Sequence, residues 1–60
     1  MTQNYYFILE RDKGMYRSSI GAGISWTSNK NHAWKFPTRA RAEAEKMRGE
    51  KVLEVEGGYP

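Results

Sequence analysis

The sequence predicts a small α+β domain: an antiparallel sheet of three to four strands with one helix packed across it, in the order β-β-(β)-α-β. Three observations lead to this fold class. Residues 4–11 and 15–20 are rich in aromatic and β-branched side chains and enclose a glycine turn. Residues 39–48 are rich in alanine and glutamate behind a threonine, and residues 50–56 are a valine-rich segment typical of a last strand.

A β-hairpin is predicted where the first two apolar segments meet. The residues Asp-Lys-Gly at 12–14 suit a three-residue turn in which the glycine takes a left-handed backbone conformation. Such a turn places Arg11 opposite Met15 and Glu10 opposite Tyr16.

Both faces of the first strand carry apolar side chains. Tyr6 and Ile8 share one face with Tyr16, whereas Phe7 and Leu9 share the other. One helix covers only one face, so the face of Tyr6, Ile8 and Tyr16 needs loops or a second molecule. We expect this face to support a weak homodimer.

Glycine and proline delimit the middle of the chain. The stretch "GAG" at 21–23 predicts a turn or bulge, and residues 24–27 are typical of a short strand. Residues 28–31 have the composition of a turn. Residues 33–36 are expected to be extended and to stop at Pro37, which disfavours helix in the residue before it.

A single helix is predicted over residues 39–48. Thr38 suits its N-cap, and Gly49 suits its C-terminal end. Its apolar stripe, with spacings of i, i+4 and i+7, consists of Ala40, Ala44 and Met47.

The rest of the chain is expected to belong to the same domain. Leu53 and Val55 lie on one face of the last strand. We expect residues 1–56 to form one domain and residues 57–60 to form a flexible tail.

The composition argues against catalysis and against metal binding. The chain of 60 residues has no cysteine and one histidine, and Asp12 lies in the predicted turn with no reason to meet that histidine. A nucleophile–base–acid set and a zinc site are therefore not expected, nor is a cofactor. The longest apolar run, "YYFIL", is too short to span a bilayer. We expect a soluble, cytoplasmic, non-enzymatic protein.

The charge is unevenly distributed. The net charge is +3, and residues 13–42 contain no acidic residue. A surface of one sign favours anionic partners. The start of the helix, with its free N–H groups, is either an anion site or a solvated face. The candidate binding residues are Arg17, Lys30, His32, Lys35, Arg39 and Arg41.

Trp26 and Trp34 have two alternative roles. They pack into the core, or they stack on nucleic-acid bases while lysines follow the backbone. A domain this short has few other large residues to fill its interior, so we expect mainly core packing, with the basic residues between them facing outward.

The stretch "ISWTSNKNHAWKFPTRARAEA" resembles small phage and prophage accessory proteins. The matching residues are Trp26-Thr27, Ala33, Phe36, Thr38, Ala44 and the "VLEV" of residues 52–55. The resemblance implies stoichiometric binding to a host machine; such proteins include inhibitors of CRISPR and other defence systems, RNA polymerase modulators and nuclease inhibitors. Many such inhibitors are acidic mimics of DNA, whereas this chain is basic.

Two functions are therefore expected as alternatives. The first is a non-enzymatic phage-type protein, in the host cell cytoplasm, that blocks or modulates a host protein or nucleoprotein complex. The second is a small basic domain that binds nucleic acid directly. Neither involves a membrane.

Overall fold

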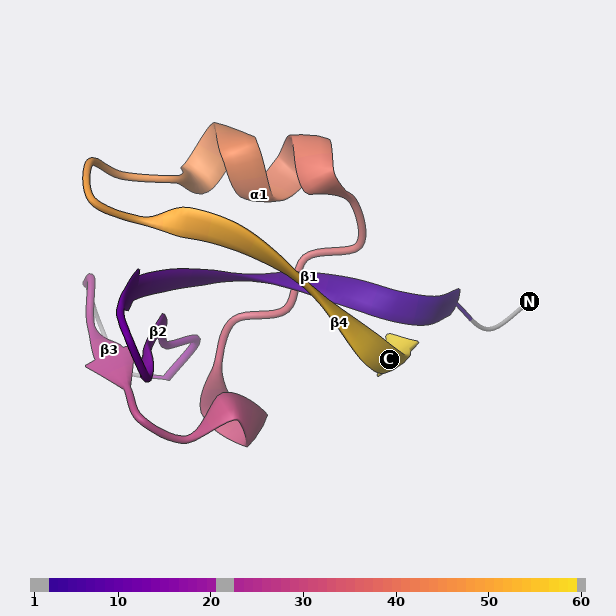
Figure 1. Ribbon diagram of the computed structural model, residues 1–60, viewed down its shortest axis with the longest axis horizontal. Helices are drawn as coiled ribbons and strands as arrows, with labels where there is room; N and C mark the ends of the chain where they lie inside the picture. The colour runs from indigo at the N-terminus through magenta and orange to yellow at the C-terminus, as the bar shows by residue number, and fades with distance from the viewer. Residues whose placement is uncertain (1–2, 21–22, 60) are drawn as a thin grey trace.

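A four-stranded antiparallel sheet with one α-helix confirms the predicted α+β class. The computed structural model describes residues 3–20 and 23–59. Its elements are β1 (Gln3–Asp12), β2 (Met15–Arg17), β3 (Trp26–Thr27), the 3-10 helix η1 (Lys30–His32), α1 (Arg39–Glu45) and β4 (Lys51–Tyr59). The sheet order is β3-β2-β1-β4. In Figure 1, α1 lies above the sheet and η1 lies below it.

The β1–β2 hairpin follows the prediction in part. Its turn glycine has a φ of +84°, and Glu10 lies opposite Tyr16, as expected. Asp12 rather than Arg11 lies opposite Met15, so that part of the register was wrong. The physical reason is a bulge in β1 between Glu10 and Asp12, which leaves Arg11 as the extra residue.

Residues 33–36 are extended, as predicted, and they run beside β1. Phe36 and Phe7 exchange two backbone hydrogen bonds, with N···O distances of 2.9 and 2.8 Å. The N–H of Trp34 donates to the carbonyl oxygen of Arg17 at 2.8 Å. This segment therefore extends the sheet beyond the short strand β2 and passes from η1 to α1 (Figure 1).

The helix begins where predicted and ends early. Thr38 Oγ1 accepts the N–H of Arg41 at 3.1 Å, which confirms the N-cap. The last helical residue is Glu45, because Lys46 is extended, with φ −63° and ψ 134°. Gly49, with a φ of +88°, belongs to the turn that follows rather than to the helix end.

The apolar side of α1 differs from the predicted stripe. Ala42 is fully buried and packs in a cluster with Phe7, Leu9 and Phe36. The predicted stripe residues Ala40, Ala44 and Met47 are all exposed, so that prediction was wrong. A helix of seven residues presents about two turns to the sheet, and its one buried small side chain lets it lie close to β1.

The second face of the sheet is covered by the chain itself. Ile8 is fully buried, and Tyr6 and Tyr16 are half-buried. Lys30 and Lys35 place their ammonium groups over the rings of Tyr16 and Tyr6. Ile8, the central apolar residue of the face expected to form a homodimer, is therefore already buried within the monomer.

Two further predictions fall at or near residues that the structure does not describe. In the turn predicted at 21–23, residues 21 and 22 lie outside the described residues, and Gly23 has a φ of +77°. Residues 57–59, expected in a flexible tail, continue β4, and Tyr59 lies opposite Gln3. Residue 60 lies outside the described residues.

Candidate functional site

Four of the six predicted binding residues lie between η1 and the first turn of α1, and we call this set the basic edge. Lys30 and Lys35 lie in and just after η1, and Arg39 and Arg41 lie in the first turn of α1. Lys35 is half-buried, and the other three are exposed. Residues 13–42 contain no acidic residue, and the nearest acids along the chain, Glu43 and Glu45, follow the two arginines by one helical turn. Within residues 3–20 and 23–59, no salt bridge neutralises the four cations.

The basic edge wraps around one side of the sheet. The ammonium of Lys35 lies 5.5 Å from the centre of the Tyr6 ring, and the guanidinium of Arg39 lies 5.2 Å from that of Phe7. Consecutive strand residues point to opposite faces, so these two cations lie on opposite faces of β1. The extended residues 33–36 carry the chain from one face of β1 to the other (Figure 1).

His32 lies on η1, near the basic edge in sequence. Its side chain is exposed, and its backbone carbonyl accepts the N–H of Ser19 at 3.4 Å. Its position is that of a surface residue at the end of a helical turn.

Arg17 departs from the predicted set because it is buried. Only 4% of its surface is exposed. Its guanidinium forms a bidentate salt bridge with the carboxylate of Glu50. Nε donates to Oε2 at 2.8 Å, and Nη2 donates to Oε1 at 2.7 Å. Glu50 is also buried, with 5% exposed. Arg17 therefore contributes no charge to the surface.

The Glu50 carboxylate and Arg17 Nη2 have further hydrogen-bond partners. The indole N–H of Trp26 donates to Glu50 Oε2 at 3.0 Å, and the backbone N–H of Met47 donates to Oε1 at 2.8 Å. Arg17 Nη2 also donates to the carbonyl oxygen of Glu45, the last residue of α1, at 2.9 Å. The network therefore joins β2, β3, the end of α1 and the turn before β4.

This network stabilises the charged form of Glu50. The hydrogen bonds from Arg17 are the main cause, and they lower the pKa of Glu50 from its ordinary 4.5 to about 2 despite its burial. The N–H donors of Met47 and Trp26 add to the effect. The pKa of Glu10 is lowered as well, chiefly by a hydrogen bond from the N–H of Gly14 and then by Lys51.

The depressed pKa of Glu50 predicts acid sensitivity. A carboxyl group with a lower pKa in the folded state stabilises the fold above its unfolded pKa, and this stabilisation is lost as the pH falls from about 4.5 to about 2. At about 1.4 kcal/mol per pKa unit, the loss is roughly 3 kcal/mol. Urea denaturation at pH 7, 5, 4.5, 3 and 2.5 follows this loss.

An exposed carboxylate provides the control for this prediction. Glu54→Gln should leave the loss of stability between pH 4.5 and pH 3 unchanged, because Glu54 is exposed. A wild-type protein that is equally stable at pH 5 and pH 2.5 would contradict the prediction.

Sequence reasoning missed Glu50 and the role of the Trp26 indole. Arg17 and Glu50 are 33 positions apart, and no periodic pattern relates them. One signal was available: Arg17 lies in a stretch with no acidic residue, so a counter-charge for it had to come from a distant part of the chain.

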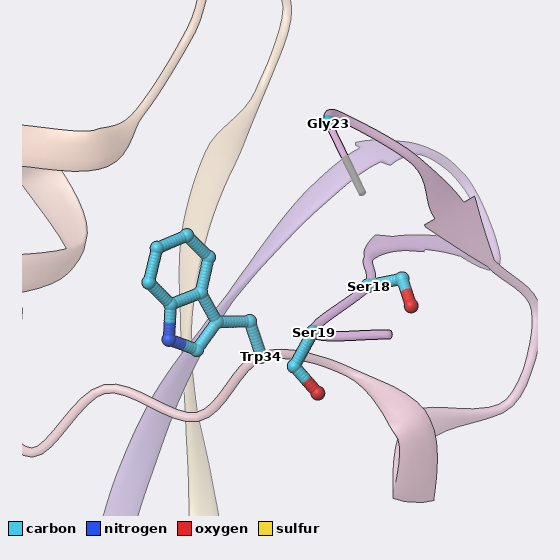
Figure 2. Close-up of a pocket in the computed structure, with 4 residues that line it drawn as sticks. All are labelled: Ser18, Ser19, Gly23 and Trp34. Carbon is cyan, nitrogen blue, oxygen red and sulfur yellow. The ribbon is translucent and has the colours of Figure 1, made fainter. Parts of the chain in front are cut away.

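A separate hollow lies between Trp34 and the loop after β2. Its volume is about 240 Å³, and it is lined by Ser18, Ser19, Gly23 and Trp34 (Figure 2). Trp34 also packs against the core cluster, with its ring centre 4.6 Å from that of Phe36. The described lining offers hydroxyl groups and an indole to a ligand, and no charged group.

Within residues 3–20 and 23–59, no helix combines the length and apolar character needed to cross a membrane. Comparisons with protein-family models, with curated proteins and with solved structures each found no match.

Proposed function

We propose that this protein acts by stoichiometric binding, with the basic edge held against an acidic face of a larger assembly. The observation that carries the proposal is the set of four cations, Lys30, Lys35, Arg39 and Arg41, around one side of the sheet. Three of the four lie close to aromatic rings, which restrict their positions. A fixed set of charges of one sign favours an anionic partner and speeds the encounter with it.

The sequence resemblance to phage accessory proteins indicates the kind of partner that is proposed. The assembly is then a host protein or nucleoprotein complex, such as a CRISPR or other defence complex, and binding blocks or modulates it in the host cytoplasm. The buried Arg17–Glu50 pair is part of the scaffold for this surface and does not contact the partner.

Direct nucleic-acid binding is the second candidate, favoured by one observation. Two lysines of the basic edge lie over tyrosine rings, with Lys30 5.8 Å from the ring centre of Tyr16 and Lys35 5.5 Å from that of Tyr6. Aromatic side chains beside cations are the usual elements of single-strand binding surfaces.

Capture from a bacterial lysate, with and without nuclease, separates the two candidates. A protein complex recovered equally in both conditions supports the first, and it can then be purified for affinity measurements. Recovery that disappears after nuclease treatment supports the second. For a single strand held by about four phosphate contacts, log affinity should fall with log salt with a slope near −2.8. A protein partner should give a shallower slope.

Charge reversal tests the basic edge itself. We expect Lys30→Glu/Arg41→Glu to weaken binding to the captured complex about tenfold or more, because each attraction becomes a repulsion. The matched control is Lys46→Glu/Arg48→Glu, which changes the net charge equally at exposed positions outside the basic edge. Lys51 is unsuitable as a control because its ammonium pairs with Glu10 at 3.3 Å.

Both double variants should keep the wild-type midpoint of urea denaturation within a small margin, since exposed substitutions change stability by under about 0.5 kcal/mol. Equal binding by the two variants would show that the basic edge faces solvent and does not contact the partner, which would contradict the proposal.

A further inference from the structure

The outer edge of β4 is unpaired among the described residues. β4 is the last strand of the sheet, and its partner is β1. On the other side of β1, Phe7 exchanges both of its backbone hydrogen bonds with Phe36, so its N–H and C=O point away from β4. These groups alternate in direction along a strand, and Tyr6 and Ile8 therefore point theirs toward β4.

The register identifies which groups of β4 point outward. Tyr6 lies opposite Val55, and Ile8 lies opposite Leu53, so Val55 and Leu53 are the residues that bond to β1. Within residues 3–20 and 23–59, β1 is the one strand that pairs with β4, so the intervening backbone groups of β4 have no strand partner. The outward N–H and C=O groups belong to Val52, Glu54 and Glu56.

The side chains beside this edge differ in character on the two faces of the sheet. Glu54 and Glu56 lie opposite Phe7 and Tyr5, on the face covered by α1, and both are exposed. Neither carboxylate has an ion-pair partner within residues 3–20 and 23–59. The opposite face presents half-buried aliphatic side chains, those of Leu53 and Val55.

We propose that the outer edge of β4 binds an extended segment of another protein by β-strand addition, and that this segment alternates Lys or Arg with apolar β-branched residues. The added strand completes the backbone hydrogen bonds of Val52, Glu54 and Glu56. Its cations lie beside the two carboxylates, and its apolar side chains extend the aliphatic face of Leu53 and Val55.

A second copy of this chain fits the edge poorly. A symmetric antiparallel pairing of two β4 strands that uses all three outward residues places Glu54 opposite its own counterpart, with no cation between them. Like charges directly opposite each other destabilise a strand pair. The carboxylate of Glu54 therefore disfavours this self-pairing, and the two carboxylates together favour a basic partner.

This edge is distinct from the basic edge. β1 lies between β4 and residues 33–36, so the two surfaces border opposite sides of the same strand. They also prefer partners of opposite charge, so this inference stands without the function proposed above.

Hydrogen exchange with designed peptides tests the inference. The probe is the peptide Thr-Lys-Val-Lys-Val-Lys-Thr, and the control is Thr-Glu-Val-Glu-Val-Glu-Thr, which has the same length and the same strand-forming valines. In the free protein, the amides of Leu53 and Val55 should exchange slowly, while those of Val52, Glu54 and Glu56 exchange fast. The basic peptide should bind about tenfold more tightly than the acidic one and should slow the three fast amides.

Two variants separate backbone pairing from charge. Glu54→Lys/Glu56→Lys should reverse the preference between the peptides. Glu54→Pro removes an outward N–H and no bond to β1, so it should abolish peptide binding, whereas Glu54→Thr keeps the N–H and should retain binding. Equal affinity for both peptides, slowed exchange elsewhere in the chain, or a dimer that protects the amides of Val52, Glu54 and Glu56 would overturn the inference.

Discussion

Glu50→Gln is expected to lower the free energy of unfolding by about 3 to 5 kcal/mol, the usual cost of removing one partner from a buried ion pair. The variant keeps the shape of the side chain but leaves the guanidinium of Arg17, 4% exposed, without its counter-charge. A domain of 60 residues has about 3 to 9 kcal/mol of stability in total. The variant should therefore lose about a third or more of its stability, which urea titration followed by circular dichroism measures.

A double-mutant cycle isolates the interaction between the two charges. Arg17→Met and Glu50→Leu should each be strongly destabilising, whereas the double variant should be more stable than either single variant because neither charge remains buried alone. The double variant should not reach wild type, since Trp26 and the N–H of Met47 lose their acceptor. Single variants that lose less than about 1 kcal/mol would show that the pair contributes little.

The mutation and the acid titration measure the same contact in two ways. Protonation of Glu50 near pH 2 and its replacement by glutamine both remove the carboxylate charge opposite Arg17. The loss of stability on acidification should therefore be close to the loss in the variant at pH 7. A large difference between the two would point to other carboxyl groups, such as Glu10, whose pKa is also lowered.

Features set by neighbouring residues were predictable from the sequence. The Asp-Lys-Gly turn puts a glycine where φ is positive, and Thr38 precedes a helix whose N–H groups need an acceptor. Both depend on contacts within about four residues. The α+β class followed from these local signals together with the three apolar strand segments.

Features set by distant contacts were not predictable in this way. The helix ends at Glu45 because the following turn wraps around the carboxylate of Glu50, which accepts the N–H of Met47. The carbonyl of Glu45 in turn accepts a hydrogen bond from Arg17 on β2. A pattern of alanines carries no information about these partners, and the predicted stripe therefore fell on the wrong residues.

In the candidate site, too, some features are set by neighbouring residues and others by distant contacts. Lys30, Arg39 and Arg41 are exposed as expected. Burying a cation without a partner costs free energy, so such a residue stays in water. Arg17 has the same residue type and lies in the same acid-free stretch, yet it is buried, since a distant carboxylate compensates its desolvation. Burial of a cation depends on a partner that sequence spacing does not reveal.

Phe36→Ala is expected to cost about 3 to 5 kcal/mol, because it removes the largest fully buried side chain of the domain as described. The Phe36 ring packs with Phe7, Leu9 and Ala42, and the centre of the Trp34 ring lies 4.6 Å away. These four neighbours belong to three segments: β1, α1 and the extended residues 33–36. Alanine would leave a cavity where the segments meet, and a domain this small has few other contacts to hold them together.

Two comparison variants make the Phe36 prediction specific. Phe36→Leu retains most of the buried volume and should cost under about 1.5 kcal/mol. Tyr5→Ala removes an aromatic ring of similar size at a position that is 44% exposed, and it should cost much less than Phe36→Ala. Urea denaturation of the three variants gives the ranking directly. If Phe36→Ala unfolds near the wild-type midpoint, residues 33–36 do not hold the helix against the sheet, and the basic edge that they support loses its structural basis.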